Sequence, residues 1–290
     1  PFAGVLANHV GSARHADMLR ESLPAGMRWF GAVMRDVDAA LPERHLGLLQ
    51  AAEIDDLGAR LDRLADHLER TGAAELPPTV AFPVVAVAEI PPLLAGKRIA
   101  IAHDAAYGFL YPANVDTLRA LGAELAFFSP LAGEGLPAQC DAVWLPGGYP
   151  ELHGAALAAN AGLWVGLRAH VAAGKPVLAE CGGLMSLLDA IVDKAGVEHA
   201  FAGLLPGRAV MQKRLAALGM QEVDLPGGRL TGHTFHYSRT ETPLEPWLRA
   251  RRPDGGEGEA IYRRGPITAS YVHFWFPSNP VAVAGLFGGG

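Results

Sequence analysis

Short apolar runs alternate with helical patterns from residue 98 onward, and this alternation limits the possible folds more than any other feature of the sequence. The apolar runs have the length of buried strands and occupy residues 98–102, 124–130, 141–148 and 175–180. Helical patterns lie between them, at 113–122 and within 152–174. This order predicts an α/β fold with a mostly parallel sheet in three layers, because the helices must cover both faces of the sheet.

The first 75 residues predict a smaller α/β unit. Residues 2–10 and 26–35 are expected to form strands and 15–22 a helix, with a loop over 41–48. Residues 53–70 carry apolar positions three and four apart, which is typical of an amphipathic helix. The sequence has no initiator Met and opens inside a strand without a preceding partner, so we expect it to be part of a longer protein.

Residues 76–96 contain five prolines and almost no charge. Proline neither continues a helix nor donates a hydrogen bond to a sheet, so this segment is expected to be a linker. The predicted organisation is therefore a first domain over 1–75, a linker over 76–96 and a second domain over 97–290.

The overall composition excludes several classes of partner. With 24 Lys and Arg against 30 Asp and Glu, the net charge is −6 and no basic block is present, so we expect no nucleic-acid partner. No apolar stretch approaches the roughly 18 residues of a membrane span, so we expect a cytoplasmic protein with no membrane partner. Two cysteines in 290 residues do not make a disulfide framework, and free thiols are expected.

The stretch LAECGGLM places Cys181 where the strand over 175–180 passes into a predicted helix over 181–191. The two glycines after the cysteine allow a tight turn, from which a side chain can project beyond the sheet. A helix N-terminus under the sulfur is expected to lower the pKa of the thiol. We therefore interpret Cys181 as a nucleophile. The alternative is a small buried hydrophobic residue, which is our interpretation of Cys140.

A thiolate nucleophile needs a base and a site for a developing oxyanion. The apolar stretch SYVHFWF predicts a strand that carries His273, either as that base or as a hydrogen-bonded core histidine. Gly147 and Gly148 end a predicted strand, where unobstructed N–H groups can face an oxyanion or simply form a turn. The N–H of Gly182 is a second candidate donor.

Together these motifs resemble the cobyrinate and hydrogenobyrinate a,c-diamide synthases, a family of amidotransferases of cobalamin biosynthesis. Their glutaminase half is of the cobyric-acid-synthase type within the class I glutamine amidotransferases. The matching stretches are LPERHLGL, RIAIAHDAAYGFLYPANVDTLRALGAELAFFSPL, VWLPGGYPE, LAECGGLM, GHTFHYS and SYVHFWF. The resemblance extends from Pro1 to about Phe287.

The resemblance implies a two-domain enzyme. A P-loop domain similar to dethiobiotin synthetases uses ATP and Mg²⁺ to phosphorylate a corrinoid carboxylate, and a glutaminase domain supplies ammonia for the a- and c-acetate groups. By motif, Cys181 is the nucleophile and His273 its base. Residues 1–75 are then the last part of the ATP domain, with Asn8 at the position that contacts adenine. Glutamine and a corrinoid tetrapyrrole are the expected partners, and a homodimer is left open.

Several positions depart from the family pattern. No G-x-x-x-x-G-K-[ST] loop occurs, so we expect ATP chemistry to be absent from this chain, which is expected to hold no cofactor or metal of its own. Trp275 stands where class I enzymes carry Glu, so a Cys–His dyad is expected. Glu180 and a backbone carbonyl are left as alternatives for orienting His273. Thr234 and Met220 replace an expected Glu and Tyr.

The remaining candidates are ligand-binding residues. Lys213 and Arg214 lie where they can hold the glutamine carboxylate, or else they form a solvated face. A further polar set is expected to bind the tetrapyrrole or bridge the domains, with ordinary hydrogen bonding as the alternative: Arg44, His45, Asp104, Tyr111, His233, His236 and Tyr237. Two other functions stay open, a non-catalytic tetrapyrrole- or partner-binding module and a different cysteine hydrolase on a similar sheet.

Overall fold

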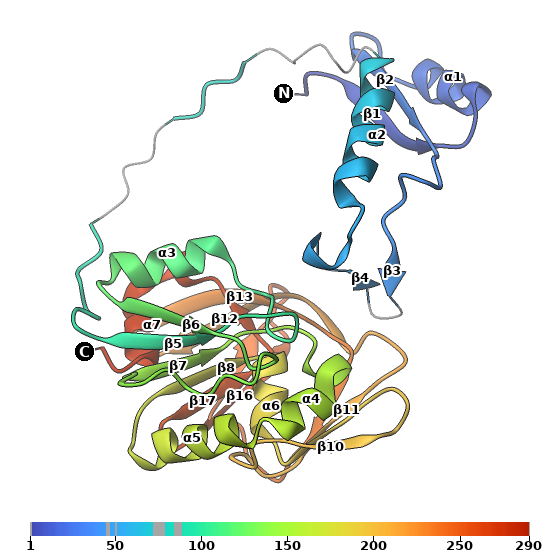
Figure 1. Cartoon of the computed structure of the whole chain (residues 1–290). Coiled ribbons are helices and arrows are strands. Elements are labelled where there is room, and N and C mark those ends of the chain that lie inside the picture. The colour runs from blue at the N-terminus through green and yellow to red at the C-terminus, as the bar shows by residue number, and fades with distance from the viewer. Residues whose placement is uncertain (1, 45–46, 50, 72–78, 84–88, 290) are drawn as a thin grey trace. The chain divides into compact units, whose positions relative to one another are not determined.

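The structure is a computed structural model that describes residues 2–44, 47–49, 51–71, 79–83 and 89–289. The chain divides into two compact units, Pro1–Val87 and Ala88–Gly290, and the division falls within the proline-rich segment 76–96 (Figure 1). His45 and part of that segment lie outside the described residues. None of the helices described in the structure combines the length and the apolar character that a membrane crossing requires.

The first unit is built on two strands, β1 (Val5–Val10) and β2 (Trp29–Met34), which pair in parallel. Helix α1 (Ala13–Glu21) connects them and begins after Ser12. The side chain of Ser12 accepts a hydrogen bond from the backbone N–H of His15, the third residue of the helix. Helix α2 (Leu57–Glu69) completes the unit. The strand–helix–strand order expected for this part of the sequence is confirmed.

One expectation for this unit is wrong in detail. The segment 41–48, expected to be a loop, contains a short antiparallel pair, β3 (Glu43–Arg44) and β4 (Gly47–Leu48). The 3-10 turn η1 (Ala51–Glu53) then leads toward α2. A pair of two-residue strands leaves no periodicity in the sequence, because alternation needs at least four residues to be recognised.

The second unit is built on one large sheet with the strand order β18-β13-β12-β15-β16-β17-β8-β7-β5-β6. Its parallel half, from β17 to β6, carries the α/β alternation that the sequence predicts. The strands of this half are β5 (Arg98–Ala102), β6 (Glu124–Phe128), β7 (Ala142–Leu145), β8 (Val177–Glu180) and β17 (Ile267–Ser270).

The other half of the sheet is antiparallel, so the sheet as a whole is mixed. Its strands are β12 (Ala217–Leu225), β13 (Gly228–His236), β15 (Leu248–Arg251), β16 (Glu257–Arg264) and β18 (His273–Phe274). A separate four-stranded sheet has the order β10-β9-β11-β14. Its strands are β9 (Ala190–Val192), β10 (Glu198–Ala200), β11 (Arg208–Met211) and β14 (Ser238–Glu241).

Helices cover both faces of the large sheet and give three layers (Figure 1). The helices α3 (Pro112–Ala120) and α7 (Pro280–Leu286) lie on one face. The opposite face carries α4 (Gly154–Ala159), α5 (Ala161–Ala172) and α6 (Gly182–Leu187). Two 3-10 turns, η3 (Pro150–His153) and η4 (Phe276–Ser278), complete the unit.

Alternation along the central strands divides the core into two apolar clusters. Val143 and Leu145 of β7 face the layer that contains α5 and α6, whereas Ala142 and Trp144 face the layer that contains α3 and α7. Trp144 is completely buried, and burying a large side chain of this kind stabilises a fold by roughly 2–3 kcal/mol. This double burial explains why the strand reads as a continuous apolar run in the sequence.

Two elements next to the predicted nucleophile and base are shorter than expected. The helix predicted over 181–191 ends at Leu187, and residues Ala190–Val192 form β9 instead. The strand predicted for SYVHFWF is reduced to His273–Phe274, because the chain bends between β17 and β18 and enters η4 directly afterwards. Both differences arise from tertiary pairing, which an apolar run does not reveal.

Candidate active site

Cys181 occupies the turn between β8 and α6, with φ +50° and ψ −106°. A positive φ is rare for a residue with a Cβ atom, and such strain is typical of residues that must project from a sheet. The glycines that follow are needed for close packing. A Cβ atom on Gly183 would overlap the carbonyl oxygen of Leu145, and one on Gly182 would lie 2.7 Å from Cδ of Pro150.

The environment of the sulfur differs from the one expected. Cys181 is only 5% exposed, and this burial raises the pKa of its thiol well above the usual range, with the Glu151 carboxylate acting in the same direction. The N–H of Gly182 lowers the pKa but does not outweigh burial. The expectation of a lowered thiol pKa is therefore wrong, because α6 contributes only one such N–H group while the apolar surroundings exclude water.

His273 reaches this region from the edge of the sheet. Its strand, β18, pairs with β13 so that His273 lies opposite His233, and their rings stack with centroids 5.1 Å apart. The ring also packs against Gly147, where an added Cβ atom would collide with it. Burial, together with the nearby His233 and His236 rings, lowers the pKa of His273 to about 3. The imidazole is therefore neutral, and its Nδ1 has no hydrogen-bond partner among the described residues.

The Gly147–Gly148 turn is the meeting point of these groups. Its first residue contacts the His273 ring, and the N atom of Gly148 lies 3.1 Å from the position that a Cβ atom on Gly182 would occupy. The glycine turn thus lies against the His273 ring through Gly147 and against Gly182, the residue after Cys181, through Gly148. A neutral base, a thiol and unobstructed N–H groups in one place can carry out acyl transfer from an amide.

Glu180 does not hydrogen-bond to the His273 ring. Its carboxyl accepts hydrogen bonds of 2.8 Å from the Trp144 indole and from the backbone N–H of Phe274. Burial raises the pKa of Glu180 to about 8, against the effect of these two bonds. Of the two alternatives for orienting the ring, the described residues show neither a hydrogen bond from Glu180 to the ring nor a backbone carbonyl bonded to its Nδ1. Trp275, which stands where class I enzymes carry Glu, is 43% exposed.

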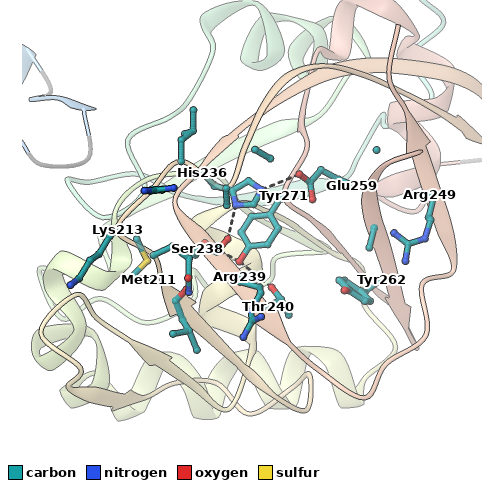
Figure 2. A pocket seen from close by; sticks show the side chains of 18 residues that line it. Met211, Lys213, His236, Ser238, Arg239, Thr240, Arg249, Glu259, Tyr262 and Tyr271 are labelled. Carbon is teal, nitrogen blue, oxygen red and sulfur yellow. Dashed lines mark hydrogen bonds and ion pairs between the residues drawn. The ribbon is translucent and has the colours of Figure 1, made fainter. Parts of the chain in front are cut away.

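A pocket of about 1000 Å³ opens over β11, β12, β14 and β16 (Figure 2). Lys213 and Arg214, predicted from the sequence as glutamine ligands, line it. The hydroxyl of Ser238, which lines the pocket, bonds to Met185 of α6, the helix that follows Cys181, and to the Tyr271 hydroxyl. The pocket lining is thus hydrogen-bonded to α6, and its Glu259 is near enough to Cys181 to act on the pKa of the thiol.

The pocket contains a buried charge network that the sequence did not indicate. Glu259 accepts hydrogen bonds from Thr234 at 3.1 Å and pairs with His236 at 3.0 Å, and the His236 ring stacks on Tyr271 at 3.7 Å. Thr234, which replaces an expected Glu, is thus still next to a carboxylate. Glu259 is part of an alternating strand with charged residues at both ends, so no sequence signal distinguishes it from a solvated acid.

The remaining predicted residues of the second unit lie in different environments. Tyr111 contacts His233, with the hydroxyl 3.4 Å from Nε2, and burial raises the pKa of Tyr111 to about 12, with the nearby Glu180 and Cys181 acting in the same direction. Asp104 instead accepts hydrogen bonds from Ala106, Ser129 and Leu131, so its carboxylate serves the loop around it. Tyr237 packs on Phe235, with Lys194 over its ring.

The predicted residues of the first unit are described separately. Asn8 and His9 of β1 line a small pocket of about 270 Å³, together with Asp36. Hydrogen bonds from Arg63 and His67 hold the pKa of Asp36 well below its usual range, and its carboxylate forms an ion pair with Arg63. Arg44 belongs to β3, and its side chain is outside the described atoms.

A strained cysteine between a parallel strand and a helix, with a histidine from a later strand, is an arrangement typical of cysteine-dependent enzymes of the α/β class. Residues 98–281 match the family model of the CobB/CobQ-like glutamine amidotransferase domain, and the chain belongs to this family.

Two relatives illustrate the likeness. A hydrogenobyrinate a,c-diamide synthase of Stutzerimonas stutzeri (strain A1501) is 56% identical over 99% of this chain and 66% of its own length. A cobyrinate a,c-diamide synthase of Herminiimonas arsenicoxydans is 45% identical, with the same coverage. The chain thus spans 66% of the length of these curated relatives. A solved glutamine amidotransferase aligns with 65% of this chain and 96% of its own, at 21% identity and a TM-score of 0.47.

Proposed function

We propose that this chain supplies the glutaminase half of an a,c-diamide synthase, in which glutamine is hydrolysed to provide ammonia for a corrinoid. The observation that carries the proposal is the convergence of the Cys181 turn and the buried His273 ring on Gly147–Gly148. Family membership and the names of the relatives give it the substrate class.

The buried site favours a mechanism that begins from neutral groups. His273 takes the proton from the Cys181 thiol while the sulfur attacks the side-chain amide carbon of glutamine. The N–H groups of Gly148 and Gly182 stabilise the oxyanion of the tetrahedral intermediate. The imidazolium returns its proton to the leaving nitrogen, ammonia departs and a glutamyl thioester remains. Water, deprotonated by the neutral His273, then cleaves the thioester to glutamate and restores the thiol.

The pocket next to this site suits the zwitterionic end of glutamine. Lys213 and Arg214 provide positive charge for the α-carboxylate, and Arg can bind it in a bidentate manner. Glu259 is the acidic residue of the pocket lining and provides the partner for the α-ammonium group. Both charges of the substrate thus have a complement in one cavity.

The acceptor half of the reaction stays a proposal drawn from the relatives. The a- and c-acetate carboxylates of hydrogenobyrinic or cobyrinic acid would receive the ammonia, and Tyr111, His233, His236 and Tyr237 remain candidates for the corrinoid or for an interdomain contact. Asn8 and its small pocket suit a nucleotide base, and Asp36 of the same pocket is already paired with Arg63 and His67. No step that needs ATP or Mg²⁺ is derived from these residues. A cytoplasmic location and a homodimer are parts of the same proposal.

Glutamate release tests the glutaminase proposal directly. We expect the chain to release glutamate from glutamine, and Cys181→Ser to reduce the rate at least 1,000-fold, because a hydroxyl is a far weaker nucleophile than a thiol in this setting. Cys140→Ser is the matched control and should keep the activity. Release that does not depend on Cys181 would favour the non-catalytic binding module, and release from other amides but not glutamine would favour a different cysteine hydrolase.

The pocket assignment is tested by the Michaelis constant. We expect Glu259→Gln to raise the KM for glutamine by about tenfold, equivalent to about 1.4 kcal/mol, with a smaller change in kcat. The matched control is Glu257→Gln on the same strand, because the side chain of Glu257 is 81% exposed whereas that of Glu259 is 17% exposed. An unchanged KM in a folded Glu259→Gln protein would remove Glu259 from the substrate site.

A further inference from the structure

The carboxyl group of Glu180 is the most buried acid near the site, and the proposed mechanism does not use it. Glu180 is 2% exposed and directly precedes Cys181 in the chain. An acid at such a position is costly unless each oxygen finds a donor. One oxygen accepts from the Trp144 indole and the other from the backbone N–H of Phe274, the residue that follows His273.

The strand that carries His273 needs support from outside the sheet. Strand β18 has two residues and lies at one end of the sheet order, so it pairs with β13 alone. The backbone of His273 and Trp275 faces β13, where the Trp275 N–H donates to Thr231. The backbone of Phe274 therefore faces the other way, toward a side of β18 that no described strand occupies.

Two buried side chains take the place of that missing strand. Glu180 accepts the Phe274 N–H, and the amide of Asn114 donates to the Phe274 carbonyl at 2.8 Å. Asn114 also accepts the N–H of Phe276 at 2.9 Å, so the segment that follows the histidine is held by successive hydrogen bonds. A short edge strand that is fixed in this way keeps its side chains in one orientation.

We propose that Glu180 is a positioning residue: through the Phe274 N–H, its carboxyl group holds the His273 imidazole against the turn that presents Cys181. The inference deepens the proposed function and rests on it. Glu180 precedes the nucleophile Cys181 in the chain, and its side chain accepts a hydrogen bond from Phe274, the residue after the base His273. One side chain therefore links the segments that carry the two reacting groups. The link runs through the backbone N–H of Phe274, and the His273 ring itself has no carboxylate partner among the described residues.

The experiment uses the 290-residue chain and begins with the Cys181-dependent release of glutamate, which tests the proposed function by itself. Glu180→Gln then tests the positioning role. The amide has one acceptor oxygen, so one of the two donors loses its partner. We expect kcat to fall 10- to 100-fold with KM within threefold, since a displacement of about 1 Å in a reacting group has effects of this size. Wild-type kcat in this variant would overturn the inference.

Trp144→Phe is the matched control. It removes the other donor to Glu180 and leaves the Phe274 hydrogen bond, so we expect kcat within threefold of wild type. If Trp144→Phe lowers kcat as much as Glu180→Gln does, general packing around the carboxyl explains the effect and the positioning role is wrong.

A second readout does not depend on activity. In protein labelled with ¹³C-histidine, we expect the ring signal of His273 to shift or broaden in Glu180→Gln and to stay unchanged in Trp144→Phe. An unchanged signal in Glu180→Gln would overturn the inference even if glutaminase activity were absent. Should Glu180→Gln not fold, Glu180→Asp replaces it, because the shorter carboxylate cannot reach the Phe274 N–H. If neither variant folds, the role of Glu180 is structural and the inference is wrong.

Discussion

At the residue scale, the burial of both reacting groups sets the chemistry of the site. Burial raises the pKa of the Cys181 thiol and lowers the pKa of His273 to about 3, so both groups are neutral at rest. In the proposed mechanism, transfer of a proton between them creates an ion pair only when the substrate is bound and the Gly148 and Gly182 N–H groups face an oxyanion. A resting thiolate, which the position of Cys181 before a helix suggested, would cost more in this environment.

The buried histidine predicts a dependence of stability on pH. An unfolded histidine has a pKa of about 6.5, so between this value and the folded value of about 3 the unfolded chain binds more protons. Lowering the pH therefore lowers the free energy of unfolding. Relative to His273→Gln, we expect wild type to lose about 2 kcal/mol between pH 7 and pH 5, measured by urea unfolding. The Glu180 carboxyl has the opposite effect but is present in both proteins, so it cancels. A difference that stays constant with pH would contradict the assignment of a buried neutral ring.

At the scale of elements, the β8–α6 turn is defined by backbone contacts rather than by the intrinsic preferences of its residues. Helix α6 has six residues, all buried, and its N-cap residue has a strained conformation. The turn persists because Gly183 lets α6 approach β7 and Gly148 lets the neighbouring loop approach Ala106. An isolated helix of this length would not form in water, so packing alone maintains it.

Two glycine-to-alanine substitutions test this interpretation. In Gly183→Ala, the new methyl group would overlap the backbone carbonyl of Leu145, which cannot move aside as a side chain can. We expect a loss of at least about 3 kcal/mol in the free energy of unfolding. In Gly166→Ala, within α5, the nearest atom lies 3.9 Å away, so we expect a gain of up to about 1 kcal/mol from helix propensity. Equal effects at the two sites would show that the turn does not depend on close approach.

At the scale of the whole molecule, the two units differ greatly in their cores. Both large apolar clusters lie within the second unit, between Leu94 and Phe287. Helices α1 and α2 of the first unit contain no buried residue among those described. The buried apolar residues described there are Val10, Val33, Ala39 and Ile54. Because stability follows the apolar area removed from water, the first unit should be much the weaker of the two.

Calorimetry tests this predicted difference in stability between the two units. We expect two transitions on heating, with the first unit unfolding at the lower temperature and the second retaining its own transition when residues 88–290 are produced alone. Hydrogen exchange should show the same order, with faster exchange in β1 and β2 than in β7 and β8. A single cooperative transition that is lost in the 88–290 chain would contradict the independence of the two units.

Much of the fold could be predicted because its signals are local. The apolar runs around Ile101, Trp144 and Leu178 indicated buried parallel strands, and the structure has strands at each. The antiparallel half of the sheet could not be ordered in this way. Short turns join some neighbours, such as β12 and β13, but other pairings, such as that of β13 with β18, join residues far apart in the chain, and nothing in either stretch specifies the other.

The sequence by itself determined that a cysteine would stand at a strand–helix turn followed by glycines, because these are properties of adjacent residues. Only the tertiary structure decided which groups surround that cysteine. It buries the sulfur, brings His273 from a distant edge strand to Gly147, and places Glu259 in the pocket. The physical reason is that pKa values and hydrogen-bond partners depend on which groups surround an atom in space, and a linear order of residues does not contain those distances.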